Sequence, residues 1–134
     1  MTSALALKMF IIHSHFTDIN NLRTYYLRGG AGMPLILLHG WPEWSHVWRP
    51  VMSRLVDRFD LIAPDFRGFG DTQKTALHHA KDATPDALAS DILALADRLG
   101  LERFGIVAHD VGGFEAQVVA RRAPQRVQRL IYGN

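Results

Sequence analysis

The sequence has 134 residues and contains no cysteine. Without a thiol, the chain has neither a disulfide framework nor a Cys-ligated zinc or iron–sulfur site, and it has no thiolate nucleophile. The chain also has no large excess of charge of one sign, because it has 15 Lys and Arg residues and 13 Asp and Glu residues. This near balance excludes a disordered acidic or basic tail, and it gives no clustered basic face for nucleic acid. We therefore expect no nucleic-acid partner.

Long apolar runs are missing too. No stretch approaches the roughly 18 apolar residues that cross a bilayer. The apolar start at residues 1–12 lacks a basic leading region and is interrupted by Lys8, so a signal peptide is not expected. With 48% hydrophobic residues, the length suits one domain that buries about two-thirds of its unfolded surface. The sequence predicts a soluble, cytoplasmic domain without a membrane partner.

Short apolar runs alternate with amphipathic segments along the chain. Residues 10–17 and 23–28 are rich in β-branched and aromatic residues, and the polar residues 18–21 between them predict a hairpin connection. Continuous apolar runs are typical of strands buried on both faces of a parallel sheet. Further strands are predicted at residues 34–38, 60–63, 104–108 and 127–132.

Three helices are predicted between these strands. The first covers residues 48–55, and the third runs from residue 114 to about 123, where Pro124 ends it. The second begins at Pro85 after the capping Thr84 and ends before Gly100. Strands and helices that alternate at this spacing predict an α/β fold with a mostly parallel sheet, led by an antiparallel hairpin.

The turn after residues 104–108 carries the most informative residues of the chain. A sharp strand-to-helix turn needs small neighbours, and Ala108, Gly112 and Gly113 supply them. Asp110 stands at its centre, where a serine hydrolase carries its nucleophile. The following helix directs its N-terminal dipole and free N–H groups towards this turn. We predict that Asp110 is a nucleophile; the alternative is an aspartate that only caps the helix.

An aspartate nucleophile restricts the chemistry. A carboxylate is already ionised at neutral pH and attacks without a base. Attack on an ester carbonyl would give a reactive anhydride, whereas attack on an sp3 carbon with a strained or departing group gives a stable alkyl ester. Epoxides and alkyl halides are such substrates, and hydrolysis of the ester needs an activated water and an oxyanion hole. We expect the backbone N–H groups of Trp41 and Val111 to be the oxyanion donors.

Three segments together resemble the α/β-hydrolase superfamily, and within it the epoxide hydrolase and haloalkane dehalogenase branch. They are residues 39–42 (HGWP), 62–71 (IAPDFRGFGD) and 109–113 (HDVGG). The resemblance runs from about residue 10 to residue 134 and implies an α/β-hydrolase fold with an Asp nucleophile. It also implies an Asp–His pair for ester hydrolysis and, in epoxide hydrolases, lid tyrosines that protonate the opening ring. The motif positions expected to line the site are His39, Gly40, Pro42, His109, Gly112 and Gly113.

Three positions depart from the family pattern. Val111 stands where many relatives carry a Trp whose indole N–H stabilises a halide. Val111 and Phe114 also occupy the places where fluoroacetate dehalogenase-like members use arginines to hold a carboxylate, while Ala108 in place of Gly is a mild change. The sequence therefore favours an epoxide hydrolase with a small apolar substrate over a haloalkane or haloacid dehalogenase.

The residues that would complete a triad do not follow Asp110 in this sequence. All seven histidines precede it, and the only acid after it is Glu115 in the next helix. The family order places the acid and the histidine after the nucleophile. We expect residues 1–134 to be the N-terminal part of one core domain, without the lid and the C-terminal strands. Such a chain would form the alkyl ester without turnover. The alternative is a non-catalytic fragment or binding module that needs a complementing chain and self-associates through its exposed apolar surface.

The remaining histidines give no metal site. His13 and His15 share one face of a strand, but no third ligand is evident. His78 and His79 lie with Asp82 in a polar loop and are expected to be solvated. The sequence predicts neither a metal nor a cofactor.

Overall fold

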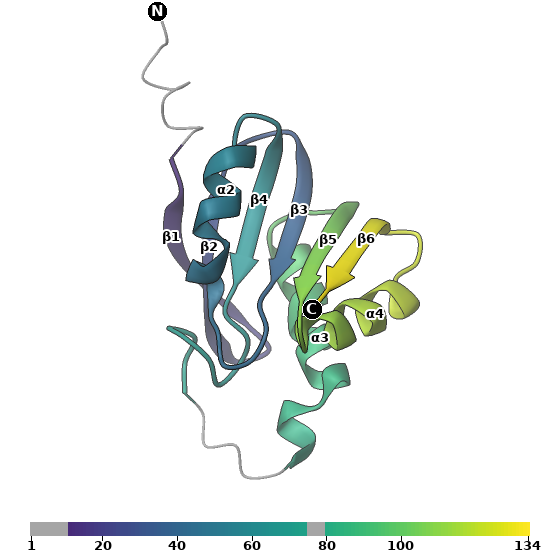
Figure 1. Ribbon diagram of the computed structural model, residues 1–134. Coiled ribbons are helices and arrows are strands. Elements are labelled where there is room, and N and C mark those ends of the chain that lie inside the picture. The colour runs from purple at the N-terminus through teal and green to yellow at the C-terminus, as the bar shows by residue number, and fades with distance from the viewer. Residues whose placement is uncertain (1–10, 75–79) are drawn as a thin grey trace, which may run out of the picture.

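Six strands form one mixed sheet in the computed structural model, which describes residues 11–74 and 80–134. The order across the sheet is β1-β2-β4-β3-β5-β6. The strands are β1 (His13–Ile19), β2 (Leu22–Gly29), β3 (Met33–Leu38), β4 (Phe59–Pro64), β5 (Phe104–His109) and β6 (Val127–Gly133). β2 pairs antiparallel with β1 and β4, and the remaining pairs are parallel. This arrangement confirms the predicted fold class (Figure 1).

The turn between β1 and β2 is shorter than the sequence predicted. Asp18 and Ile19 continue β1 and pair with β2, so only Asn20 and Asn21 form the connection. Both asparagines have positive φ, at 49° and 60°. Asparagine tolerates this left-handed conformation because its short side chain hydrogen-bonds locally, and two such residues suit a tight hairpin. The predicted connection over residues 18–21 was therefore wrong for its first two residues.

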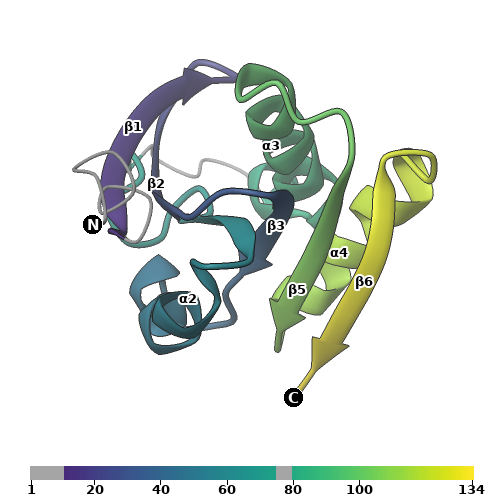
Figure 2. The same cartoon turned by 90° about the horizontal axis from the view of Figure 1, so that it is seen from above.

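Helices cover both faces of the sheet (Figure 2). Helix α2 (Arg49–Leu55) confirms the helix predicted over 48–55, with its start one residue later, and the 3-10 helix η1 (Ser45–Trp48) precedes it. The 3-10 helix η2 (Ala80–Ala83) precedes α3 (Pro85–Arg98), and α4 (Gly112–Arg122) begins two residues earlier than predicted. The predicted cap of α3 is confirmed, because the Ala87 N–H donates to Thr84 Oγ1 at 3.2 Å.

The central strands bury side chains on both faces, as their continuous apolar sequences predicted. One face packs against α2 through a core that includes Leu37, Leu61, Ala63, Met52 and Val56. The other packs against α3 and α4 and includes Ile36, Leu38, Ile62, Ile106, Ile92, Leu95 and Val119. Figure 1 shows the carboxyl ends of β3 and β5 at the same edge of the sheet. This edge is where the loops of the predicted site begin.

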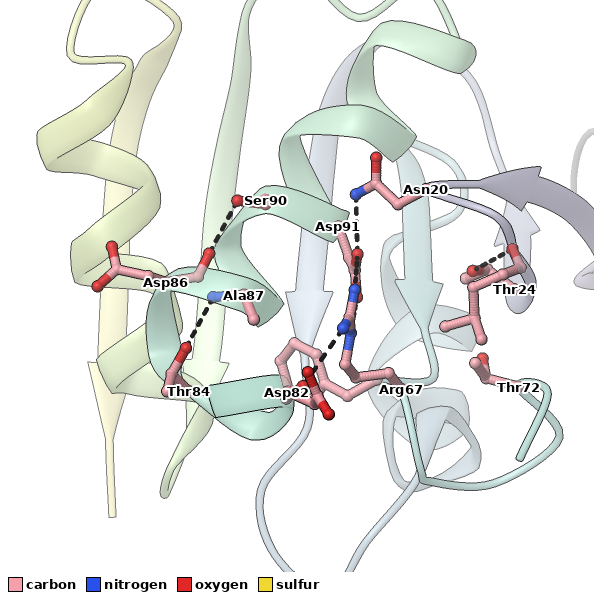
Figure 3. A network of polar contacts seen from close by, with 12 residues as sticks. Asn20, Thr24, Arg67, Thr72, Asp82, Thr84, Asp86, Ala87, Ser90 and Asp91 are labelled. Carbon is pink, nitrogen blue, oxygen red and sulfur yellow. Dashed lines mark hydrogen bonds and ion pairs between the residues drawn. The ribbon is translucent and has the colours of Figure 1, made fainter. Parts of the chain in front are cut away.

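A polar network fixes the loop that follows β4 (Figure 3). Arg67 donates to the two carboxylate oxygens of Asp91 at 2.6 and 2.7 Å, and to the carbonyl oxygen of Asp82 at 3.3 Å. The Asn20 side chain donates to the same Asp91 carboxylate at 2.9 Å. One buried carboxylate on α3 therefore joins the loop after β4 to the β1–β2 turn.

We expect this ion pair to matter more for stability than an exposed one. Asp91→Ala leaves the Arg67 guanidinium without its carboxylate partner in a mostly buried place, so the free energy of unfolding should fall by about 3 kcal/mol. Asp97, the partner of Arg126, has a side chain that is 67% exposed, and Asp97→Ala should cost at most about 1 kcal/mol. Urea denaturation measures both variants. Equal losses would contradict the structural role assigned to Asp91.

Candidate active site

Asp110 occupies a strained turn between β5 and α4. Its φ is 55°, a conformation that a non-glycine residue rarely adopts and that clusters at functional sites. The turn is held by its own backbone, since the Asp110 N–H donates to the Gly133 carbonyl at 3.0 Å and Gly113 N–H donates to the Asp110 carbonyl at 3.0 Å. Val111 is the N-cap residue of α4, and its side chain makes no capping hydrogen bond. Asp110 precedes the N-cap position, and its side chain is exposed at the sheet edge.

Two glycines allow other backbone segments to approach this turn. A Cβ on Gly40 would lie 2.5 Å from the Cβ of Asp110, and a Cβ on Gly112 would lie 2.6 Å from the His39 carbonyl oxygen. Both distances are shorter than real contacts between such atoms. Gly113 is less restricted, because its nearest neighbour would be the Tyr132 ring at 3.3 Å. Gly40 and Gly112 therefore permit the loop after β3 to touch the Asp110 turn.

A backbone N–H group from the loop after β3 binds the Asp110 carboxylate. The Trp41 N–H donates to Oδ1 with an N···O distance of 3.2 Å. Hydrogen bonds from the backbone of Val111 and then of Trp41 lower the pKa of Asp110, because they favour its charged form. The carboxylate is therefore ionised at neutral pH. The structure brings together the three residues that the sequence singled out for nucleophile and donors.

His39 lies beneath the turn rather than in an open cleft, and its side chain is fully buried. Phe66 N–H donates to His39 Nε2 at 3.1 Å, so Nε2 is an acceptor. The other ring nitrogen then carries the proton and donates to the Gly40 carbonyl at 2.8 Å. Burial lowers the pKa of His39. A neutral imidazole thus connects the loop after β3 to the loop after β4.

Asp65 supports the same loops, although the sequence analysis did not single it out. Its buried carboxylate accepts the Ser45 N–H at 2.6 Å and the Asp71 N–H at 2.8 Å. Gly70 leaves room for this carboxylate, since a Cβ there would lie 2.1 Å from Asp65 Oδ2. The motif at residues 62–71 was a signal that this loop matters. The identity of a backbone donor twenty residues away, at Ser45, could not be read from it.

Glu43 is a second residue that the sequence analysis did not single out. Its Oε2 atom accepts the Gly40 N–H at 3.0 Å and lies 3.2 Å from His109 Nδ1. Glu43 follows Pro42 in the turn after β3, while His109 is the last residue of β5 and directly precedes Asp110. One carboxylate oxygen therefore touches both segments that form the site.

Two open clefts flank the Asp110 turn. The first has a volume of about 360 Å³, and its lining includes Asp110, Val111, Gly113, Phe114, Gln117 and Tyr132. The second has about 390 Å³, and its lining includes Glu43, Val47, Trp48, Val51, Ala108 and His109. Trp41 and Trp44, in the segment after β3, are both exposed. An ionised carboxylate beside largely apolar walls can attack an apolar electrophile.

Glu115, the only acid after Asp110 in the sequence, lies on the buried side of α4. Burial raises the pKa of its carboxyl, and within the described residues its Oε2 atom has no hydrogen-bond partner. Among the described residues, no contact links the Glu115 carboxyl to the Asp110 turn.

No group of three or more metal-ligating side chains occurs within residues 11–74 and 80–134. His13 and His15 lie on one face of β1 with their ring centroids 6.4 Å apart. His78 and His79 fall outside the described residues. Among the helices that the structure describes, none has the length and apolar character needed to cross a membrane.

Known proteins are similar to this chain in sequence. The sequence pattern of the family described as "alpha/beta hydrolase fold" matches residues 33–132. A soluble epoxide hydrolase from Corynebacterium sp. (strain C12) is 39% identical over 119 residues, which are 89% of this chain and 40% of that protein. Haloalkane dehalogenase 2 from Mycobacterium tuberculosis (strain ATCC 25618 / H37Rv) is 32% identical over 127 residues, 95% of this chain and 43% of that protein.

Solved structures show the same similarity. An epoxide hydrolase solved without ligand, CorEH, superposes with a TM-score of 0.86 at 37% identity, over 91% of this chain and 42% of that one. Epoxide hydrolase VrEH1 from Vigna radiata gives a TM-score of 0.85 at 29% identity, over 92% and 40% of the two chains. This chain spans about 40% of the length of the relatives that it matches.

Acidification should destabilise the fold through His39. Because its pKa is lower in the folded chain, the unfolded chain binds more protons once the pH falls below about 6.5. The contribution of the neutral ring is complete above that pH and decreases as the pH falls towards the folded pKa. His39→Gln lacks the titrating ring, so its deficit in unfolding free energy relative to wild type should shrink between about pH 7.5 and 5.5. Urea denaturation at both pH values measures this deficit; a constant deficit would contradict the role of the neutral imidazole.

Proposed function

The chain belongs to the α/β-hydrolase family, and on that premise we propose that it carries the nucleophilic half of an epoxide hydrolase, with Asp110 as the nucleophile. One observation supports this proposal most strongly. The ionised Asp110 carboxylate stands on a strained turn in an open cleft, and Trp41 N–H binds its Oδ1 atom at 3.2 Å. Similarity to several epoxide hydrolases supports the same chemistry.

In the proposed first step, a carboxylate oxygen of Asp110 attacks one ring carbon of the epoxide. The new C–O bond forms as the bond between that carbon and the ring oxygen breaks, and the electron pair stays on the ring oxygen. A proton from solvent converts this oxygen to a hydroxyl group. The product is a hydroxyalkyl ester of Asp110. The oxygen bound by the Trp41 N–H becomes the ester carbonyl oxygen in this scheme.

The same N–H groups suit hydrolysis of that ester. Charge develops on the carbonyl oxygen when water attacks, and the donors of Trp41 and Val111 would stabilise it. The step also needs an activated water, and no histidine follows Asp110 in the sequence. The family order places the acid and histidine of the triad after the nucleophile. We therefore propose that residues 1–134 by themselves form the ester and retain it.

The proposed substrate is a small apolar epoxide. Val111, Phe114 and Tyr132 line the cleft beside Asp110, and none of them is cationic. Without a positive charge among these three side chains, the cleft offers no cationic partner from them for a carboxylate substrate.

A haloalkane dehalogenase is the second candidate, supported by the similarity to haloalkane dehalogenase 2. Its chemistry would use the same attack by Asp110 on an sp3 carbon, with a halide as the leaving group. Val111 has no side-chain donor for that halide, which places this function second.

The third candidate is a binding module that requires a complementing chain. The edge strand β6 supports it, because Ile131 and Tyr132 are exposed there. If the chain is a binding module, we also predict that it self-associates through this exposed apolar surface.

Styrene oxide should alkylate Asp110 once and irreversibly. Intact-mass analysis of residues 1–134 after incubation is expected to show one adduct, and peptide mapping should place it on Asp110. Asp110→Asn should reduce labelling to background, whereas Asp97→Asn, at an exposed carboxylate elsewhere, should label as wild type. Absence of an adduct and of diol would contradict the nucleophile, and sustained diol formation would contradict retention of the ester.

Halide release separates the epoxide and dehalogenase candidates. With 1-chlorobutane or fluoroacetate we expect no halide above background, because no side-chain donor at position 111 stabilises the leaving ion. Val111→Trp supplies an indole N–H at that position and should bring chloride release above background. Chloride release by wild type that outpaces alkylation by styrene oxide would favour the dehalogenase instead.

A further inference from the structure

The turn at residues 40–43 carries the Trp41 N–H, and Glu43 closes this turn twice. The Glu43 N–H donates to the Gly40 carbonyl at 3.1 Å. The Gly40 N–H in return donates to the Glu43 side chain, at Oε2, at 3.0 Å. The Gly40 carbonyl lies in the peptide plane between Gly40 and Trp41, and the Gly40 N–H lies in the plane before it, so Glu43 restrains both planes. The plane between Gly40 and Trp41 contains the Trp41 N–H that donates to Asp110.

The Glu43 carboxylate also reaches the second segment of the site. The atom that accepts from Gly40 lies 3.2 Å from His109 Nδ1. An ionised carboxylate only accepts hydrogen bonds, so Nδ1 carries the proton in this contact. The Glu43 side chain is 27% exposed, which shields the contact partly from water. Since His109 directly precedes Asp110, Glu43 joins the loop after β3 to the end of β5.

We propose that Glu43 is a positioning residue that fixes these two segments relative to one another and so holds the Trp41 N–H against Asp110 Oδ1. The inference deepens the proposed function, since it rests on the roles given there to Trp41 and Asp110. His39 complements Glu43 from below, because its Nδ1–H binds the Gly40 carbonyl while Glu43 binds the Gly40 N–H.

A role for the length of the Glu43 side chain and a role for its charge predict opposite shifts in the pKa of Asp110. If Glu43 acts by reach, a shorter side chain loosens the Trp41 donor and raises the pKa of Asp110. If it acted only by charge, removal of a nearby negative charge would lower that pKa. The other ionisable side chain at this contact is His109 on β5, and His39 beneath the turn is neutral.

Two variants separate these effects. Glu43→Asp keeps the charge but is one methylene shorter, whereas Glu43→Gln keeps the length and an acceptor oxygen without the charge. We would follow the Asp110 side-chain carboxyl by NMR titration in each variant and in wild type. Glu43→Asp is expected to raise the pKa of Asp110, and Glu43→Gln to leave it near the wild-type value. Glu102→Asp and Glu102→Gln, at an exposed glutamate outside both clefts, serve as matched controls. Both should leave the pKa of Asp110 at the wild-type value.

The outcomes decide between the two roles. An unchanged pKa in Glu43→Asp, or a lowered pKa in Glu43→Gln, would overturn the positioning role. If Glu43→Asp does not fold by its amide spectrum, the Glu43→Gln titration still distinguishes reach from charge. The readout requires no epoxide, so it is independent of the proposed function. A shift in Glu43→Asp with no styrene oxide adduct in wild type would leave the positioning role standing and reject the function.

Discussion

The close approach of Gly40 to Asp110 is the constraint on which the rest of the site depends. A Cβ at position 40 would lie 2.5 Å from the Asp110 Cβ, so no larger residue fits while both loops keep their places. This approach lets the Trp41 N–H reach the carboxylate at 3.2 Å. The sheet makes it feasible, because β3 and β5 are adjacent parallel strands whose carboxyl ends meet at one edge. The two neighbouring strands therefore place a backbone N–H donor within hydrogen-bond distance of an exposed carboxylate.

Buried polar side chains hold the loops that this contact requires. His39 bridges the Gly40 carbonyl and the Phe66 N–H, and Asp65 binds backbone donors at Ser45 and Asp71. Each of these groups is satisfied by backbone partners from different loops, so each fixes the distance between segments far apart in sequence. The stability of the molecule and the placement of its candidate nucleophile therefore depend on the same few hydrogen bonds.

Sequence patterns predicted the fold and the sharp turn that carries Asp110, and the reasons are local. Uninterrupted apolar runs identify buried parallel strands, Thr84 and Pro85 identify the start of α3, and glycines beside Asp110 identify a sharp turn. The error at residues 18–21 arose because two asparagines suffice for the hairpin turn, which polarity alone does not reveal. The contacts of Asp65 and Glu43 could not be predicted, since their partners are set by how distant loops meet.

The central claim is that Asp110 forms a covalent ester whose carbonyl oxygen is held by backbone donors. A crystal structure of residues 1–134 after reaction with styrene oxide tests it most directly. The account predicts continuous density from the Asp110 carboxyl to the opened epoxide, with the ester carbonyl oxygen within hydrogen-bond distance of Trp41 and Val111 N–H groups. Density on another side chain, or an ester carbonyl turned away from both donors, would contradict it.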